Sequence, residues 1–421
     1  MGNILVEGGC SLRGEVNISG AKNAALPIII ACLLSSKTLV VSNIPQLSDV
    51  SDILSLLKNC GVLVEVIGDG TIALTADKIT NDFVFPCDLV KKTRASIWIL
   101  VPLLLRLGRA KIALPGGCAI GRRRIDLHVA VLEAFGANIQ VDDVYISANC
   151  SSKLYGINFT FNKISVGATI TAIMIAVLAK GSTKLTNCAQ EPEIVDLCYC
   201  LRKMGADING IGTANISIVG VKELNGTNYS IIPDRIEAGT YMIAAAITKG
   251  KIQLNNVIFD HLKSVIVKLQ LSGAIIQYQS KNSLIIEGAS IIKQVNVQTN
   301  PYPNFPTDLQ AQFMSLMSIA QGVSVITENI YENRYKHAFE LIKMGANIVI
   351  QDRKAIVTGV KKLHGTEVVA TDLRASVSLI LAGLSADGLT RVTHVHHLDR
   401  GYEFLVKKLQ NCNARIQRIS A

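Results

Sequence analysis

The sequence repeats one short signature six times. In each copy a helical segment ends at Gly or Asn, and an apolar, β-like run follows within a few residues. The six positions are Gly61, Gly136, Gly205, Gly273, Gly345 and Asn413. They are separated by 75, 69, 68, 72 and 68 residues. Gly and Asn accept the left-handed backbone that often ends a helix, and a regular period predicts a repeated structural unit.

A second helix recurs between these positions and is apolar on nearly every face. The apolar segments span residues 28–35, 103–108, 173–181, 243–250, 314–322 and 378–388. A helix without a polar face must be buried on nearly all sides. Each unit is therefore predicted to contain one central helix, one outer amphipathic helix and several strands. Six such units in 421 residues predict an α/β fold of two domains, each with three repeated units and pseudo-threefold symmetry.

The two ends of the chain are predicted to complete one unit. The sixth unit stops after the strand-like run 415–418 and lacks the second strand of the units before it. The N-terminal run 4–7 supplies such a strand, and the next run, 12–16, resembles residues 363–368. We therefore expect residues 1–20 to belong to the last unit.

The predicted domains follow from this assignment. One domain is continuous and spans residues 21–232, whereas the other is discontinuous and combines residues 1–20 with residues 233–421. Two connections then cross between the domains, which predicts a hinged cleft flanked by them.

Composition narrows the class of protein. With 49% hydrophobic and 18% charged residues, the chain has ample material for large cores and is not a disordered protein. We find no apolar stretch long enough to span a bilayer and no signal peptide, so a cytoplasmic protein without a membrane partner is expected. Ten cysteines form no CxxC pair, which argues against a zinc site or a disulfide framework and for a reducing compartment.

The net charge of +10 leaves three interpretations open. It is typical of a solvated basic surface, of a nucleic-acid-binding surface, or of a pocket for phosphorylated substrates. No basic run carries interleaved aromatic residues, which disfavours nucleic acid.

Several helix starts carry polar residues that core packing does not explain. These residues are Lys22, Asn23, Lys91, Lys92, Arg94, Lys163, Ser165, Asp234, Arg235, Glu237, Asp308, Asp372 and Arg374. A cation at this end opposes the helix dipole at a cost of about 0.3–1 kcal/mol, whereas a carboxylate is favourable there. Lys22, Arg94 and Arg374 are therefore the informative residues, and they indicate anion-binding sites. The alternative is a set of solvated basic side chains at the domain surface.

One cysteine lies in a loop of glycines and arginines. Cys118 follows Gly116 and Gly117, and three arginines stand at positions 122–124. Nearby positive charge lowers the pKa of a thiol, so Cys118 is predicted to be reactive. The other nine cysteines are interpreted as small buried hydrophobic residues. No Gly-Lys-Ser/Thr sequence follows, which excludes a Walker A loop.

The histidines are assigned no chemistry. His128 is expected on an amphipathic helix and is interpreted as structural. His394, His396 and His397 have no carboxylate placed to complete a metal set, so a strand surface is expected. Residues 399–403 are expected to form a turn into the last helix, with Arg400 at its start. No metal and no cofactor are predicted.

Ten motifs, in order along nearly the whole chain, resemble those of the UDP-N-acetylglucosamine 1-carboxyvinyltransferases, a branch of the enolpyruvyl transferases. They lie at residues 19–27, 94–98, 115–123, 163–167, 191–196, 233–237, 305–312, 332–334, 371–376 and 399–402. So many motifs in the same order, Pro115-Gly-Gly-Cys118 among them, make the resemblance highly specific. The resemblance implies two inside-out α/β domains with three repeats each, which agrees with the repeats found in the sequence.

The resemblance also implies a reaction. The 3′-hydroxyl of UDP-N-acetylglucosamine would displace phosphate from phosphoenolpyruvate by addition and elimination, in the first committed step of bacterial peptidoglycan synthesis. Such a transferase is expected to be a cytoplasmic monomer that needs no cofactor, binds no nucleic acid and is a target of fosfomycin.

The resemblance assigns catalytic roles to four residues. Cys118 would donate a proton to the methylene carbon of phosphoenolpyruvate and could form a covalent adduct with it. Asp308 would accept the proton of the hydroxyl group. Lys22 and Arg400 complete the predicted catalytic set. Arg334 would help to lock the closed state.

Substrate contacts are implied in the same way. The predicted phosphoenolpyruvate-binding residues are Lys22, Asn23, Arg123, Arg374 and Arg400. The predicted contacts of UDP-N-acetylglucosamine are Asn23, Arg94, Arg123, Arg124, Ile125, Asp126, Leu127, Lys163, Ile164, Ser165, Val166, Asp308 and Ile330. Arg94 and Arg374 would also stabilise the anionic intermediate.

The chain departs from the family pattern at three positions. Arg124 stands where the family usually has Pro, so the hinge of the cysteine loop is expected to differ. Asn413 replaces the usual Gly, and Arg122 adds charge beside the loop. None of these changes removes a chemical group.

Two alternatives to this function remain. One is 3-phosphoshikimate 1-carboxyvinyltransferase, which has the same fold and the same donor. The Cys118 loop and the Lys163-x-Ser165-Val stretch disfavour it. The other is a basic nucleic-acid-binding repeat protein, which the complete catalytic set disfavours.

Overall fold

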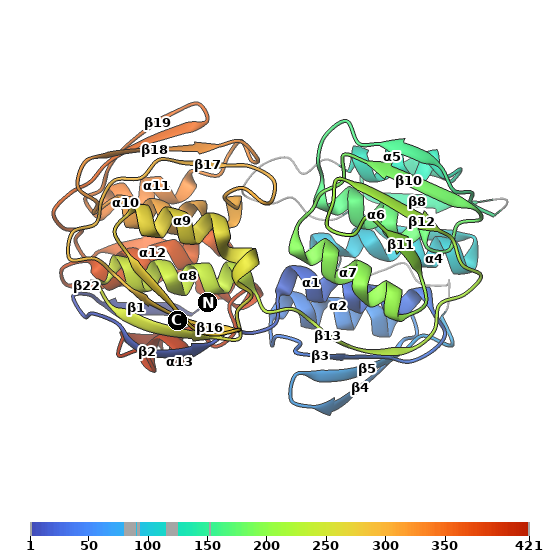
Figure 1. The fold of residues 1–421 in the computed structure, drawn as a ribbon, viewed down its shortest axis with the longest axis horizontal. Coiled ribbons are helices and arrows are strands. Elements are labelled where there is room, and N and C mark those ends of the chain that lie inside the picture. The colour runs from blue at the N-terminus through green and yellow to red at the C-terminus, as the bar shows by residue number, and fades with distance from the viewer. Residues whose placement is uncertain (1, 80–89, 91–92, 115–124, 151–152, 420–421) are drawn as a thin grey trace. The chain divides into compact units, whose positions relative to one another are not determined.

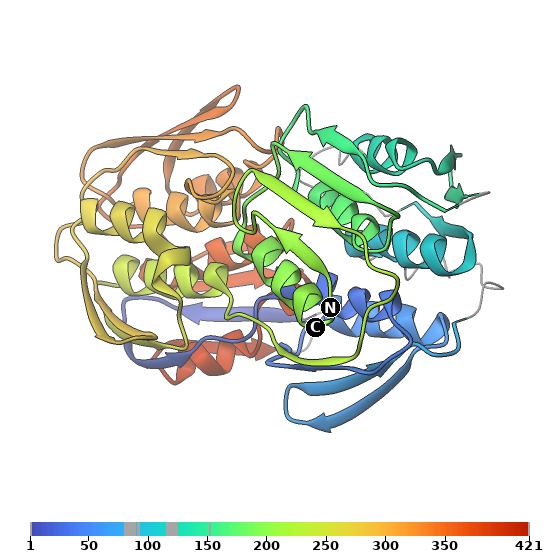
Figure 2. The same cartoon turned by 45° about the vertical axis from the view of Figure 1, so that its right-hand side comes forward.

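The computed structural model describes residues 2–79, 90, 93–114, 125–150 and 153–419. The chain forms two compact units. The terminal unit contains the chain up to Ser19 and from Pro233 onward, and the middle unit contains described residues between Gly20 and Ile232. Within the terminal unit, the blue N-terminal strands lie among yellow-to-red elements (Figures 1 and 2). The two ends of the sequence therefore share one core.

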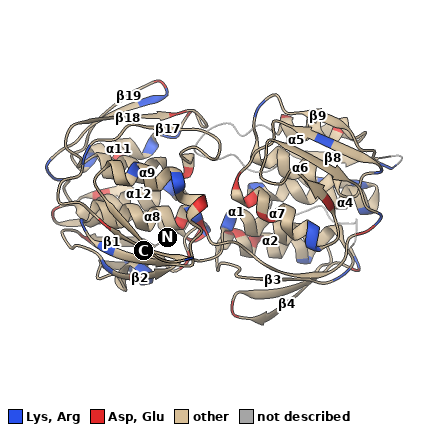
Figure 3. Ribbon diagram, viewed as in Figure 1, with Lys and Arg blue, Asp and Glu red and all other residues tan. Residues whose placement is uncertain are grey.

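Six apolar helices form the centres of the two units. In the terminal unit they are α8 (Arg235–Ile247), α10 (Gln310–Met317) and α12 (Leu373–Ser385), which pack against one another. In the middle unit they are α1 (Lys22–Ala31), α4 (Leu100–Leu107) and α6 (Val166–Ala176). These helices carry few charged residues (Figure 3). The prediction of buried central helices is confirmed.

Each unit also has outer helices with one exposed face. They are α2 (Ser48–Asn59), α5 (Asp126–Ala134), α7 (Pro192–Lys203), α9 (Lys263–Leu271), α11 (Lys336–Lys343) and α13 (Leu405–Gln410). Short 3₁₀ helices add η1 (Cys32–Leu34), η2 (Arg94–Ile99), η3 (Phe259–Leu262), η4 (Thr307–Leu309) and η5 (Val395–Arg400). The backbone turns left-handed after each of these outer helices, with φ between +64° at Asn413 and +104° at Gly205. The repeated caps are confirmed.

Asn413 is the one cap with a side chain, which gives a test of this conformation. Replacing Asn413 by Ala should lower the free energy of unfolding by about 1 kcal/mol, because an ordinary side chain in the left-handed region costs about 1–2 kcal/mol. Replacing it by Gly should be neutral or slightly stabilising. Urea denaturation of both variants measures the difference, and equal midpoints for Ala and Gly would contradict it.

The strands of the terminal unit form three four-stranded sheets. Their orders are β21-β22-β1-β23, β2-β14-β16-β15 and β17-β18-β20-β19. The first pair of each sheet is parallel and the other two pairs are antiparallel. The bounds are β1 (Asn3–Glu7), β2 (Arg13–Asn17), β14 (Lys251–Asn255), β15 (Ile275–Ser280), β16 (Ser283–Glu287), β17 (Val297–Thr299), β18 (Val323–Glu328), β19 (Asn347–Gln351), β20 (Lys354–Thr358), β21 (Glu367–Val369), β22 (Leu389–Thr393) and β23 (Arg415–Ile419).

The middle unit repeats this pattern. Its sheets have the orders β13-β3-β5-β4, β9-β10-β12-β11 and, among the described residues, β6-β8-β7. The bounds are β3 (Leu39–Ser42), β4 (Leu63–Gly68), β5 (Thr71–Thr75), β6 (Arg109–Ala113), β7 (Asn138–Val141), β8 (Tyr145–Asn149), β9 (Asn158–Thr160), β10 (Ser182–Thr186), β11 (Asp207–Asn209), β12 (Asn215–Val219) and β13 (Thr227–Ser230). The α/β repeat architecture is therefore as predicted.

The N-terminal strands correct one expectation. β1 pairs antiparallel with β22 and β23, so it completes the last sheet as predicted. β2 instead pairs in parallel with β14, in a different sheet. Its resemblance to residues 363–368 reflects an equivalent place, because β21 is the parallel edge strand beside β22. The expectation that all of residues 1–20 belong to the last unit was therefore wrong.

Membrane insertion through a helix finds no support in the described part of the chain, where no helix is both long and apolar enough to cross a bilayer.

Candidate functional site

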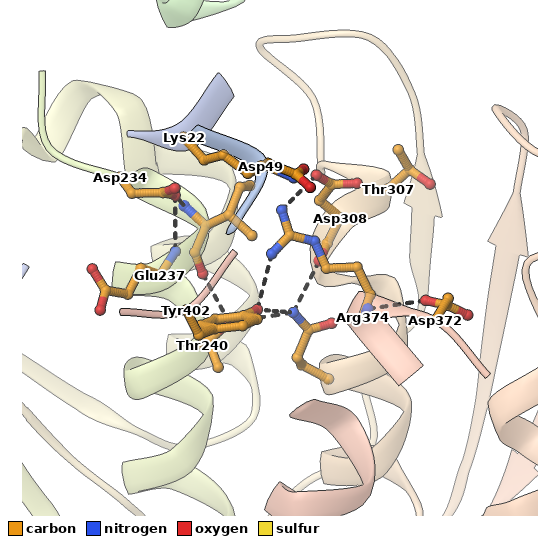
Figure 4. Close-up of polar contacts among 12 residues, drawn as sticks. Lys22, Asp49, Asp234, Glu237, Thr240, Thr307, Asp308, Asp372, Arg374 and Tyr402 are labelled. Atoms are coloured by element: carbon orange, nitrogen blue, oxygen red, sulfur yellow. Dashed lines mark hydrogen bonds and ion pairs between the residues drawn. The ribbon is translucent and has the colours of Figure 1, made fainter. Parts of the chain in front are cut away.

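Asp308 lies between two buried arginines in the terminal unit. It belongs to η4, directly before α10. Arg334 donates from Nη2 to Oδ1 at 2.7 Å. Arg374 donates from Nη2 to Oδ2 at 2.8 Å (Figure 4). The side chains of both arginines are 6% exposed, whereas that of Asp308 is 26% exposed. The carboxylate therefore faces solvent on one side and has each oxygen occupied by a guanidinium.

The protonation of Asp308 follows from this arrangement. Burial by itself would raise the pKa of Asp308, but the charges and hydrogen bonds of Arg374 and Arg334 outweigh it and hold the pKa well below its usual range. Asp308 is thus firmly ionised. A carboxylate with a low pKa and two engaged oxygens is a weak proton acceptor.

Local structure explains why Arg374 points toward Asp308. Asp372 caps α12 by accepting from the backbone N–H of Arg374 at 2.9 Å and of Ala375 at 3.1 Å. This cap fixes Arg374 in the first turn of the helix, where its charge opposes the helix dipole. The carboxylate of Asp308 offsets that charge.

A buried polar layer holds the other side of Arg374. Its Nη1 donates to Tyr402 Oη at 3.1 Å. Gln312 Nε2 donates to the same oxygen at 3.1 Å and to the Asp308 carbonyl oxygen at 2.9 Å. Tyr402 Oη lies 2.9 Å from Thr240 Oγ1, which itself donates to a helix carbonyl. Tyr402 accepts two hydrogen bonds and is left to donate to Thr240, so this layer fixes the guanidinium (Figure 4).

The neighbouring segment brings Ile330 to the same site. Thr307, beside Asp308, donates to Glu328 Oε2 at 2.8 Å, and the backbone N–H of Ile330 donates to Glu328 Oε1 at 2.8 Å. Arg334 Nη1 also donates to Thr307 at 2.7 Å. Asp308, Ile330, Arg334 and Arg374 are therefore brought together within the terminal unit.

Arg400 occupies a different position from the one expected. It ends η5, and α13 begins only at Leu405, so Arg400 does not open the last helix. The expected strand surface for the nearby histidines was also wrong. β22 ends at Thr393, and a left-handed residue, His394 with φ of +56°, turns the chain into η5. His396 and His397 therefore lie on a 3₁₀ helix.

In the middle unit, Lys22 and Asn23 open α1. Lys22 Nζ lies 3.3 Å from Asp49 Oδ2, and the side chains are 12% and 4% exposed (Figure 4). Asp49 is in the first turn of α2. The ion pair offsets the charge of a lysine at a helix start, where the dipole disfavours it.

The remaining described candidates lie at the starts of neighbouring helices in the middle unit. Ile125, Asp126 and Leu127 are at the start of α5, and Lys163, Ile164, Ser165 and Val166 lead into α6. Ser165 caps α6 by accepting from the N–H of Ala168 at 3.3 Å. Arg94 is the first residue of η2.

His128, on α5, packs against α6. Its Nδ1 lies 2.8 Å from Thr171 Oγ1, and a Cβ added to Gly167 would lie 2.9 Å from its Nε2. Burial, reinforced by the charge of Arg94, lowers the pKa of His128 to about 3. A neutral, packed histidine confirms the structural interpretation, and it explains why residue 167 is Gly.

Three predicted site residues, Cys118, Arg123 and Arg124, lie outside the described residues, as do Lys91, Lys92 and Arg122. Sequence reasoning gave no role to Thr240, Gln312 or Tyr402. Thr240 and Gln312 could have been found as polar residues inside otherwise apolar central helices. Tyr402 could have been found because it belongs to the motif at residues 399–402.

Curated relatives match this chain from end to end. The family model described as EPSP synthase (3-phosphoshikimate 1-carboxyvinyltransferase) matches residues 6–409. A protein named UDP-N-acetylglucosamine 1-carboxyvinyltransferase from Orientia tsutsugamushi (strain Ikeda) is 80% identical over 419 residues, covering 100% of both chains. A protein of the same name from Rickettsia bellii (strain OSU 85-389) is 53% identical over 422 residues, again covering 100% of both.

Solved structures share the fold. The enolpyruvyl transferase NikO from Streptomyces tendae matches with a TM-score of 0.90 at 24% identity, covering 100% of this chain and 99% of that chain. An EPSP synthase from Acinetobacter baumannii matches with a TM-score of 0.77 at 18% identity, covering 100% of both. These likenesses support the fold class alone.

Proposed function

Since the chain belongs to the enolpyruvyl transferases, and among them to the UDP-N-acetylglucosamine 1-carboxyvinyltransferases, we propose that it transfers the enolpyruvyl group of phosphoenolpyruvate to the 3′-hydroxyl of UDP-N-acetylglucosamine. The observation that carries this proposal is the 80% identity over full length to a relative of that name. The reaction would be the first committed step of peptidoglycan synthesis. It would take place in the cytoplasm, which the eight free thiols among the described cysteines support.

The proposed chemistry has two stages. In the addition, the 3′-oxygen bonds to C2 of phosphoenolpyruvate, loses its proton to Asp308, and C3 gains a proton from Cys118. In the elimination, C3 returns a proton to the Cys118 thiolate and the double bond re-forms. The bond between C2 and the bridging oxygen breaks, and the released phosphate takes up the proton held by Asp308. Lys22, Arg123 and Arg400 would hold the phosphate and carboxylate throughout.

The occupied carboxylate of Asp308 adds a step to this scheme. Asp308 becomes an effective proton acceptor when one of the two arginines that lower its pKa moves away. Of the two arginines bonded to Asp308, Arg374 is the one proposed to bind phosphoenolpyruvate, so its guanidinium would exchange Asp308 for the substrate anion. This exchange would free Oδ2, 2.8 Å from Arg374 in the described arrangement, and raise the pKa of Asp308 toward that of an effective base. The buried Tyr402 would keep Arg374 oriented during the exchange.

Phosphate release tests the proposed function. We expect the full-length protein to release phosphate only when phosphoenolpyruvate and UDP-N-acetylglucosamine are both present. Release with shikimate 3-phosphate instead would overturn the proposed acceptor. Salt-sensitive affinity for RNA or DNA without any turnover would support the nucleic-acid alternative.

A further inference from the structure

Ser19 is the last residue of the terminal unit before the chain enters the middle unit. All three of its polar groups are bonded within the terminal unit. Its N–H donates to Glu237 Oε2 at 2.8 Å, and its carbonyl oxygen accepts from the N–H of Asp234 at 2.8 Å. Its hydroxyl donates to Glu403 Oε2. A residue bonded in this way has little freedom to shift.

Lys408 bonds to Ser19 and to one of its carboxylate partners, Glu237. Its Nζ donates to Ser19 Oγ at 2.6 Å and to Glu237 Oε1 at 2.7 Å. The side chain of Glu237 is 3% exposed and that of Lys408 is 16% exposed. We call Ser19, Glu237, Glu403 and Lys408 the Ser19 cluster. An ionic cluster out of water costs desolvation free energy that a purely structural anchor need not carry.

The Ser19 cluster stands beside two proposed substrate cations in the sequence. Ser19 is three residues before Lys22, and Glu403 is three residues after Arg400. Three residues span at most about 10 Å of extended chain. Glu403 also follows Tyr402, whose hydroxyl holds Arg374. One cluster therefore fixes the end of the segment that carries Arg400 and the point from which the chain runs to Lys22.

We propose that the Ser19 cluster is a positioning device for phosphoenolpyruvate, which holds the segment of Arg400 in place within the terminal unit without touching the substrate. This inference rests on the proposed function. The bond that carries it is the one between the Ser19 hydroxyl and Glu403, because it ties the segment of Arg400 directly to the anchored Ser19. Lys408 donates to the Ser19 hydroxyl oxygen and to Glu237, which leaves the Ser19 hydroxyl hydrogen directed at Glu403.

The test compares substrate affinities in variants of the Ser19 cluster. Ser19→Ala removes the hydroxyl but keeps both backbone bonds, so the fold should be retained. We expect the Kd and KM for phosphoenolpyruvate to rise about tenfold or more, since small misplacements of binding groups weaken productive binding strongly. The KM for UDP-N-acetylglucosamine should change less than threefold. Glu403→Gln should show the same pattern.

Lys408 supplies the controls. Lys408→Met should raise the KM for phosphoenolpyruvate, and Lys408→Arg should restore part of the loss by keeping the charge. Lys407→Met changes an exposed neighbour on the same helix and should have no effect. A double variant, Lys408→Met with Glu237→Gln, removes the charge pair together and keeps the comparison open if the single variant unfolds.

Calorimetry measures phosphoenolpyruvate binding without UDP-N-acetylglucosamine. It therefore separates failure of the positioning inference from failure of the proposed function. If the unmodified protein binds phosphoenolpyruvate and turns over but Ser19→Ala and Glu403→Gln bind it equally well, the positioning inference is overturned. If kcat falls and both KM values rise in proportion to the loss of stability, the positioning inference is overturned too. If the unmodified protein neither binds phosphoenolpyruvate nor releases phosphate, the proposed function itself fails.

Discussion

Replacing Asp308 by Asn should lower kcat by about 10²- to 10⁴-fold, the range expected when a positioned proton acceptor is lost. Asn keeps the size and one acceptor oxygen, so the KM values should change much less than kcat. Steady-state phosphate release measures the effect. Asp387→Asn is the matched control, because Asp387 forms an exposed ion pair with Lys362 at 2.9 Å, and it should remain within about twofold of the unmodified rate.

The same variant tests the ion pairs of Asp308. Since the pKa of Asp308 in the folded protein lies well below its usual range, its ion pairs stabilise the fold above the unfolded pKa. That stability is lost as the pH falls through the folded pKa, below about pH 4. Asp308→Asn should therefore be less stable by about 1–3 kcal/mol at pH 7 and should lose less stability on acidification.

An unchanged kcat with both arginines still ordered would contradict the role of Asp308 as the base.

Replacing Cys118 by Ser should lower kcat by about 10²- to 10⁴-fold. It should also abolish any adduct with phosphoenolpyruvate or fosfomycin. A hydroxyl is a far weaker acid than a thiol flanked by arginines. Peptide mass spectrometry of the incubated protein locates the adduct. Cys10→Ser changes a half-buried free cysteine and should keep both activity and adduct.

Five of the other thiols are made poorly reactive by burial, which favours selective modification of Cys118. Burial raises the pKa of Cys60, Cys188, Cys198 and Cys200 to about 12 and that of Cys412 to about 11. These thiols stay protonated near neutral pH and react slowly. An adduct on one of them, with Cys118 unmodified, would contradict the assignment.

The repeat architecture could be predicted because its signals are local. A left-handed cap requires Gly or Asn at one position, and a buried helix requires apolar residues on all faces, so both are legible at a fixed period. Strand pairing is not local. The run 12–16 matches residues 363–368 in sequence, yet β2 pairs with β14, because an edge-strand pattern does not specify its neighbour.

The environment of Asp308 could not be predicted for a similar reason. Its partners Arg334 and Arg374 stand 26 and 66 residues away in the sequence, and only the fold brings both to one carboxylate. The sequence indicated a carboxylate suited to proton transfer but gave no estimate of its pKa. At His394, alternating residues resembled a strand, whereas a single left-handed residue turns the chain into η5.

The acceptor and the bond that breaks are tested together by one measurement. Phosphoenolpyruvate labelled with ¹⁸O at the bridging oxygen is incubated with the full-length protein and equal amounts of UDP-N-acetylglucosamine and shikimate 3-phosphate, and all products are weighed by mass spectrometry. We predict that only UDP-N-acetylglucosamine gains the enolpyruvyl group and that the released phosphate carries the label. An enolpyruvyl group on shikimate 3-phosphate, or label left in pyruvate, would contradict the proposed reaction.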